Sequence, residues 1–168
     1  MIAVIHRPEL VMPELVSPEL LEWLRRKVSY EGNDGQAGGW LVRNEPLPPI
    51  LEAIARAVAP GVRFDTVHFQ GYRDGRATTP CHTDERTGFS AILSIGATRT
   101  LRIHRQPEGG QTCGDYDLDV FRIECRSGTV VFMDEEFYAG WHHQIPADPE
   151  VTGERLSIVF RTKGTSNG

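Results

Sequence analysis

Apolar residues recur at two different spacings along the chain, and the change between them divides it into two parts. In the first part, residues 18–28 follow a Ser-Pro start that is typical of a helix N-terminus, and their leucines lie at helical spacing. A second helical series predicts a helix over 50–58. Between them, residues 30–49 are rich in glycine and proline, so we expect a lid-like loop in which 40–42 could form a short strand.

From residue 64 onward the pattern changes to short apolar runs separated by turn residues. These runs predict strands at 64–72, 89–95, 100–104, 116–125, 129–133, 141–145 and 156–160. Many short strands at close intervals are typical of a barrel or a double-sheet jelly roll. We therefore predict a mainly β (α+β) fold with both N-terminal helices on one outer face. A single domain should cover 1–163, followed by a disordered tail at 164–168.

Composition narrows the class of protein without identifying it. The 168 residues are 39% hydrophobic and 24% charged, as in ordinary globular domains, and the formal net charge of −5 gives no overall attraction to nucleic acid. No apolar run approaches the roughly 20 residues of a transmembrane helix. The N-terminal residues lack the pattern of a signal peptide, and the three cysteines fit no zinc spacing. We expect a cytoplasmic monomer with free thiols.

The strongest chemical signal is the pair His82 and Asp84, which are two positions apart. At the end of a strand such residues point to the same side, so both side chains can reach one ion. His143, on a later predicted strand, would complete two histidines and one carboxylate, the ligand set of a mononuclear non-haem iron(II) site. Such a set leaves positions open for a 2-oxoacid and molecular oxygen. His142 competes with His143, and each histidine taken alone is more often an ordinary surface or core residue.

Two arginines flank the apolar strand predicted at 156–160. An arginine beside a buried strand is costly unless it meets a fixed anion, and its guanidinium matches a carboxylate with two parallel hydrogen bonds. Arg155 and Arg161 are therefore candidates to hold a dicarboxylate co-substrate. Gln70 and Tyr72, on one face of an earlier strand, could add hydrogen bonds to it. The alternative is that both arginines are surface charges at the ends of the strand.

Four segments, in this order, resemble motifs of the AlkB-like family of iron(II)- and 2-oxoglutarate-dependent dioxygenases. Residues 69–75 resemble the Asn-x-Tyr-x-x-Gly sequence that leads into the family's His-x-Asp, and 91–96 resemble its strand ending in Leu-Gly. Residues 128–133 resemble its Gly-Asp-Val-Val strand, and 155–161 resemble its Arg-x-Asn-x-x-x-Arg motif. The resemblance covers roughly 38–163.

The resemblance implies a double-stranded β-helix, or jelly roll, that binds iron(II) through His82, Asp84 and His143. It also implies oxidative demethylation as the activity. In this chemistry O2 and 2-oxoglutarate yield succinate and carbon dioxide while a methyl group on nitrogen is hydroxylated, and the product then releases formaldehyde. The metal would carry the oxidation, and the protein would supply placement and exclude water.

The resemblance also assigns residues to 2-oxoglutarate. Arg155, Tyr72 and Ser157 would hold its distal carboxylate, and Arg161 with Gln70 would hold the end near the metal. Gln70 and Ser157 both stand where the family has asparagine. Because both side chains keep the ability to hydrogen-bond, the assignment remains reasonable.

The residues that would read the substrate depart further from the family. Arg86 stands where nucleic-acid demethylases carry an acidic residue, and the lid between Trp40 and Pro49 is short. Trp40 matches an aromatic that stacks on a flipped base opposite His82, although a core or lid anchor is equally compatible. The leading prediction is demethylation of alkylated nucleobases in DNA or RNA. The alternatives are the same chemistry on a protein or small molecule, and a non-catalytic barrel that binds metal or carboxylate.

Overall fold

Strands outnumber helices in this protein. The computed structural model describes residues 9–30, 36–42, 47–84, 87–105 and 120–164, with the side chains of 9, 36–42 and 120 outside the description. The strands are β1 (Glu9–Val11), β2 (Gln36–Val42), β3 (Thr66–Tyr72), β4 (Thr79–His82), β5 (Thr87–Gly96), β6 (Arg99–Arg105), β7 (Val120–Cys125), β8 (Thr129–Met133), β9 (Trp141–Ile145) and β10 (Arg155–Lys163). The helices are the 3-10 turn η1 (Pro13–Leu15), α1 (Pro18–Arg25), α2 (Pro49–Val58) and α3 (Glu135–Gly140).

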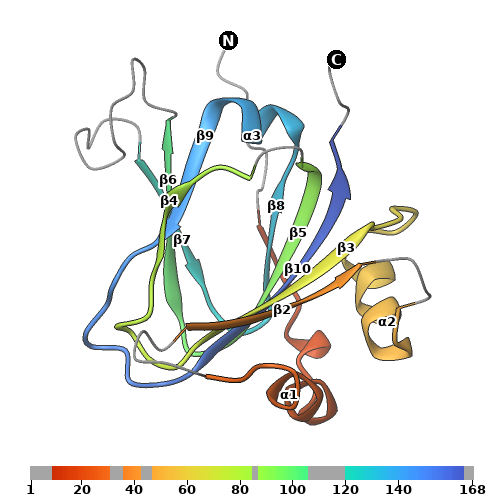
Figure 1. Ribbon diagram of the computed structural model, residues 1–168, viewed down its shortest axis with the longest axis horizontal. Coiled ribbons are helices and arrows are strands. Elements are labelled where there is room, and N and C mark those ends of the chain that lie inside the picture. Colours follow the sequence, from red (N-terminus) through yellow and green to blue (C-terminus); the bar gives the residue numbers. More distant parts are fainter. Residues whose placement is uncertain (1–8, 31–35, 43–46, 85–86, 106–119, 165–168) are drawn as a thin grey trace.

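Two antiparallel sheets form the body of the molecule (Figure 1). The larger sheet has the strand order β1-β8-β5-β10-β3-β2, and the smaller has the order β4-β9-β6-β7. Neighbours in these orders are often distant in the sequence, which is the crossing pattern of a double-sheet barrel. The arrangement is compatible with a jelly roll, so the predicted mainly β fold is confirmed.

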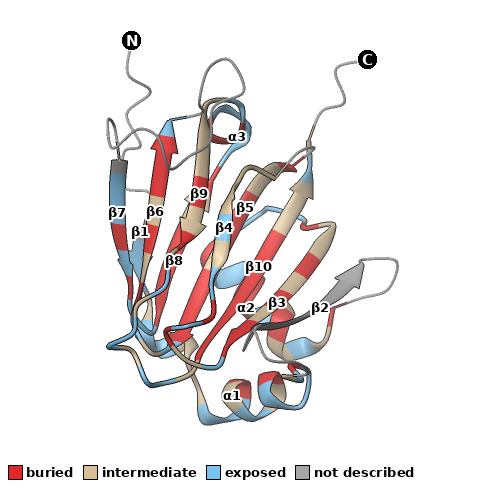
Figure 2. Cartoon of the chain, turned by 60° about the vertical axis from the view of Figure 1, so that its left-hand side comes forward, coloured by how far each residue is buried: buried red, intermediate tan, exposed pale blue. Residues whose placement is uncertain are grey.

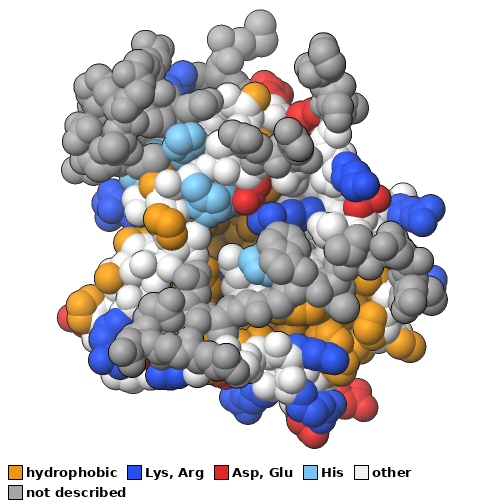
Figure 3. Space-filling model, viewed as in Figure 1, with side chains coloured by type: hydrophobic (Ala, Val, Ile, Leu, Met, Phe, Trp, Pro, Cys, Tyr) orange, Lys and Arg blue, Asp and Glu red, His pale blue; other side chains and the backbone are white. Residues whose placement is uncertain are grey.

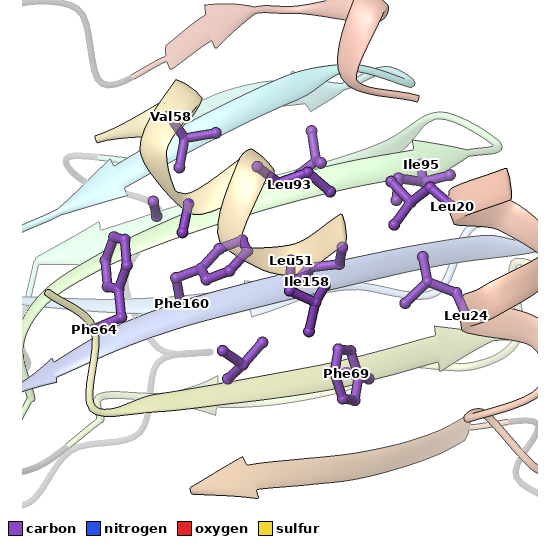
Figure 4. Packing of buried hydrophobic residues seen from close by; sticks show 14 of the residues in the cluster. Leu20, Leu24, Leu51, Val58, Phe64, Phe69, Leu93, Ile95, Ile158 and Phe160 are labelled. Carbon is purple, nitrogen blue, oxygen red and sulfur yellow. The ribbon is translucent and has the colours of Figure 1, made fainter. Parts of the chain in front are cut away.

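The outer face of the larger sheet carries the main hydrophobic core. Leu156, Ile158 and Phe160 alternate along β10 and point to this side, where they are almost fully buried. They share a cluster with Leu20 of α1 and Leu51 of α2. Figure 4 shows the two helices lying over this face, as the sequence predicts. Burial of the apolar helix stripes against the strands fixes both helices on the side away from the smaller sheet.

A second cluster fills the space between the two sheets. It joins Tyr72 and Met133 of the larger sheet to Ile103, Ile123 and Ile145 of the smaller one. Figure 2 shows buried positions on strands of both sheets. The polar side chains of the candidate site lie on the same inner faces as this cluster.

Five elements differ from the sequence prediction. β1 and η1 were not predicted, because three residues each carry no periodicity. β2 spans residues 36–42 and pairs with β3 along its whole length, although the region was expected to be largely loop. β4 and α3 were not predicted, because four residues with a proline and six residues with two glutamates carry little periodicity. The expected beginning of β7 at 116–119 and the tail beyond residue 164 lie outside the described residues.

The structure also bears on the expected free thiols and on the expected absence of a transmembrane helix. Cys125 is a buried free thiol, whereas Cys81 takes part in a disulfide bond, so the expectation that every cysteine is free is wrong. In the part of the chain that the structure describes, no helix has the length and apolar character needed to cross a bilayer.

Leucine-to-alanine substitutions on α2 and β1 should separate core packing from surface contact. Leu51 is fully buried, so Leu51→Ala is expected to lower the free energy of unfolding by about 2–5 kcal/mol. Leu10, on β1, is 43% exposed, and Leu10→Ala should cost less than about 1 kcal/mol. Denaturant unfolding of both variants measures the difference. Equal losses would contradict the placement of α2 on the sheet.

Candidate metal centre

The smaller sheet brings the three predicted ligands together. His82 ends β4 and pairs in register with His143 of the neighbouring β9, and Asp84 follows β4 by two residues. One donor atom from each residue lies within 4.8 Å of the others. His82 Nε2 is 3.6 Å from Asp84 Oδ1, and His143 Nε2 is 3.7 Å from Asp84 Oδ2. Two imidazole nitrogens and one carboxylate therefore face a common point.

Pro80 fixes the orientation of the first histidine. β4 is an edge strand, where a proline is tolerated because its missing N–H needs no partner, and its register with β9 shifts between Thr79 and His82. The Pro80 carbonyl lies 2.7 Å from His82 Nδ1. Because a carbonyl can only accept, Nδ1 carries the proton of the neutral ring, and in that form Nε2 keeps its lone pair. Such a contact sets the tautomer of a metal-binding histidine.

The local electrostatics favour the protonation states that bind metal. Burial would raise the pKa of Asp84, but the hydrogen bond from His82 and the charge of Arg161 hold it below its usual value. Burial, with the nearby His82, lowers the pKa of His143 to about 4. The hydrogen bond with Asp84 raises the pKa of His82. At neutral pH Asp84 is ionised and His143 is neutral, and both are then in the form that binds a metal ion.

The two adjacent histidines of β9 point in opposite directions. His143 is buried and faces Asp84, whereas His142 is half-buried and lies in register with His104 of β6 on the other face of the sheet. The structure therefore brings His143, and not His142, to the other candidate ligands.

Helix α3 supports the site from beside β9. The side chain of Asp134 caps its N-terminus by accepting a 2.8 Å hydrogen bond from the Phe137 amide. Tyr138, also on α3, is buried against the His143 ring, and its backbone carbonyl accepts a 3.0 Å hydrogen bond from Thr83, the residue between the first two ligands. Its hydroxyl bonds to Ser90 of β5. An Asp N-cap followed by two acidic residues is the sequence signal that could have identified this short helix, which was not predicted.

A buried arginine without a carboxylate partner lies in the adjoining cavity. Arg155 is 3% exposed, and its Nη2 donates a 3.0 Å hydrogen bond to Ser94 on β5. Its Nε and Nη1 are buried and have no hydrogen-bond partner among the described residues. Buried guanidinium donors are costly when unsatisfied, so this geometry calls for an anion. His82, His143 and Arg161 line the same cavity.

The remaining predicted co-substrate residues surround Arg155. Its guanidinium carbon lies 5.0 Å from the centre of the Tyr72 ring. The Tyr72 hydroxyl is 2.5 Å from Thr79 Oγ1 and 3.3 Å from Gln70 Oε1, and Ser157 Oγ is 3.5 Å from that same Gln70 oxygen. Gln70, Tyr72, Arg155 and Ser157 lie on inward positions of β3 and β10, since residue pairs 155–72 and 157–70 are in register. Four of the five predicted side chains, Gln70, Tyr72, Arg155 and Arg161, therefore line one cavity, and Ser157 reaches it through its contact with Gln70.

Arg161 connects this cavity to the metal centre. Its Nη2 donates a 2.7 Å hydrogen bond to Asp84 Oδ2, and both side chains are mostly buried. His68, to which the sequence assigned no role, lies on the same strand face as Gln70. Burial and the charge of Arg161 lower the pKa of His68 to about 4, so it is neutral at pH 7. Figure 3 shows histidine, acidic and arginine side chains gathered beside a hollow in this face of the molecule.

Sequence reasoning missed three supporting residues. Ser94 and Thr79 are small polar side chains that bond Arg155 and Tyr72, and only their inward position identifies them. Arg99 is fully buried and donates to backbone carbonyls of Asp74, Gly75, Ala77 and Pro146. Its side chain therefore connects two loops next to the cavity. Its guanidinium carbon also lies 5.6 Å from the centre of the Tyr72 ring.

The side chains of the two predicted substrate-binding residues, Trp40 and Arg86, are outside the description. The backbone of Trp40 pairs with that of His68 across β2 and β3, which sets it beside the cavity strand, but its side chain is outside the description. Arg86 lies outside the described residues. Their roles in substrate binding stay predictions.

Comparisons with known proteins agree with the motifs. Alpha-ketoglutarate-dependent dioxygenase alkB homolog 3 of Rattus norvegicus is 28% identical over 132 residues, covering 72% of this chain and 44% of that protein. DNA oxidative demethylase ALKBH2 of Bos taurus is 25% identical over 146 residues, covering 81% and 52% respectively. The chain spans about half the length of these curated relatives. No family model matches it.

Solved structures show the same fold at low identity. The structure of OsALKBH1 superposes with a TM-score of 0.63 at 12% identity, covering 94% of this chain and 99% of that one. Drosophila melanogaster CENP-C bound to CAL1 gives 0.50 at 10% identity, with coverage of 86% and 94%. Because one fold serves different functions, the similarity in fold does not identify the function, and the motifs and the site are the stronger evidence. In sequence and in fold the chain is AlkB-like.

Substitution of the clustered residues should abolish metal binding. His82→Ala and Asp84→Ala are each expected to weaken Fe(II) or Co(II) binding by more than roughly 100-fold, since losing a group that merely orients a ligand already costs about 10- to 100-fold. His142→Ala is the matched control and should bind as the unsubstituted chain does. Anaerobic titration followed by absorption measures all three. Tight binding in either ligand variant would refute the metal centre.

Proposed function

We propose that this AlkB-like chain is an Fe(II)- and 2-oxoglutarate-dependent dioxygenase that demethylates alkylated nucleobases in DNA or RNA. The observation that carries the proposal is the cavity that both histidines of the His82, Asp84 and His143 cluster share with the buried, incompletely bonded Arg155. Neither half alone would identify this chemistry. The similar proteins, an alpha-ketoglutarate-dependent dioxygenase and a DNA oxidative demethylase, support the same reaction.

The donor set fits iron(II). His82 and His143 would supply neutral imidazole nitrogens and Asp84 a carboxylate, which together suit a non-haem iron with open coordination positions. When bound, the metal supplies the activation of O2 that couples decarboxylation of 2-oxoglutarate to hydroxylation of the substrate methyl group. The products are succinate, carbon dioxide and a hydroxymethyl group that leaves as formaldehyde.

The protein residues bind and orient the reactants. Arg155 offers two unsatisfied donors in a fixed fork, which fits the distal carboxylate of 2-oxoglutarate, with Tyr72 at its side. Arg161 holds Asp84 in its ionised form and stands at the metal end of the same cavity. The apolar side chains of Ile92 and Val159 line the same cavity and leave part of its wall without polar groups.

A protein or small-molecule substrate is the second candidate, and one observation favours it. Two arginines beside the smaller sheet are not available for phosphate contacts, because Arg99 is buried and donates to backbone carbonyls and Arg126 is paired with Glu124 at 3.1 Å. The complete ligand set argues against the third candidate, a non-catalytic barrel. The cytoplasmic location and the monomeric state stay predictions.

Coupled product formation distinguishes the candidates. The Fe(II)-loaded chain with 2-oxoglutarate should form succinate, and a methylated single-stranded oligonucleotide should yield formaldehyde in equal amount and lose its methyl group. His82→Ala is the inactive control. Succinate formation indifferent to the oligonucleotide would move the proposal to a protein or small-molecule substrate, and no succinate would revive the binding barrel.

Loss of Arg155 should weaken use of 2-oxoglutarate specifically. Arg155→Ala removes the buried charge that faces the distal carboxylate, so KM for 2-oxoglutarate should rise by roughly 10- to 100-fold. Arg63→Ala, at an exposed arginine, is the control and should leave KM unchanged. Succinate formation at varied 2-oxoglutarate gives both values. An unchanged KM in Arg155→Ala would assign the carboxylate to another residue.

A further inference from the structure

The inner face of the smaller sheet continues past the metal centre. Trp141 and His143 are two residues apart on β9, so they point to the same side. In register, Ile103 of β6 lies between His143 of β9 and Phe121 of β7, and Arg105 lies beside Trp141. Phe121, Trp141 and Arg105 thus form the next group of side chains on this face. Figure 1 shows the start of β9 and the end of β6 at the same end of the barrel as α3.

These three side chains are not buried in the core. Ile123 and Ile145, which share the same strand faces, are buried, whereas Phe121 is 50% exposed and Trp141 is half-buried. The rings of Phe121 and Trp141 lie 5.4 Å apart at 60°. The exposed Arg105 has its guanidinium 5.3 Å from the centre of the Trp141 ring. The barrel mouth therefore presents two accessible aromatic rings with a cation against one of them.

This combination has the chemistry of a surface that stacks nucleobases. Aromatic rings accept any base on its π-face, and an adjacent arginine adds cation–π and phosphate contacts. An unpaired strand exposes such faces, whereas a duplex hides them. Trp141 is only two residues from His143, roughly 7 Å along the strand, so a base stacked there would neighbour one presented to the metal.

We propose that Phe121, Trp141 and Arg105 form a stacking platform for the base that flanks the target nucleotide in a single-stranded nucleic acid. The inference rests on the proposed function, because it takes the metal centre as the place where the target base is presented. It names the substrate class more closely: an unpaired strand bound through stacking on at least two adjacent bases, and not an isolated nucleoside.

Binding of a fluorescently labelled, unmethylated single-stranded oligonucleotide tests the platform without requiring turnover. Phe121→Ala and Phe121→Leu should each weaken binding by roughly tenfold, because both remove the ring and the second keeps most of the apolar volume. Phe121→Tyr should restore it. Leu10→Ala, at an exposed apolar residue on β1, is the control and should bind normally. Metal titration of each variant verifies that the barrel is folded.

The outcomes separate the platform from the enzyme. Ring-dependent binding without succinate formation would support the platform and refute the proposed activity. Demethylation of the oligonucleotide with affinities unchanged by Phe121→Ala and Phe121→Leu would overturn the platform and leave the activity standing. Absence of oligonucleotide binding, or ring-dependent binding of a peptide alone, would also overturn it, the latter in favour of a protein substrate.

Discussion

The alternation of side chains along β10 is the constraint on which the rest of the structure depends. This central strand is paired on both sides, so each residue must face either the helices or the cavity. Leu156, Ile158 and Phe160 bind α1 and α2 to the sheet, and Arg155 and Arg161 on the alternate positions reach the site. A register slip of one residue would bury the charges among leucines, so folding and site assembly are specified by the same pattern.

The two sheets contribute different chemistry to one cavity. The smaller sheet carries the histidines, with Asp84 just beyond its edge, and the larger sheet carries the arginines and their hydroxyl partners. Arg161 crosses between them by bonding Asp84. Because the carboxylate of Asp84 and the guanidinium groups of Arg155 and Arg161 come from opposite walls, the distance between the sheets sets the distance between the two parts of the site.

Much of this arrangement was readable from the sequence, and what was missed has identifiable causes. Strands such as β5 and β10 have enough alternating residues to be recognised, and motif spacing singled out His82, Asp84 and Arg155. β4 and α3 are too short for periodicity, and β2 is defined by pairing with β3. The bonding of Arg99 to four carbonyls depends on two loops meeting in space, which no local pattern encodes.

The edge strand β4 has a consequence for local stability. Its register with β9 includes only Thr79 and His82, and Pro80 between them offers no amide hydrogen. Backbone bonding therefore holds this strand weakly, yet it delivers one metal ligand and leads directly to another. A cation shared by His82 and His143 would tie β4 to β9 where amide bonds are lacking. Amide hydrogens around β4 should consequently exchange quickly in the metal-free protein and slow on metal loading, while those of β10 exchange slowly in both states.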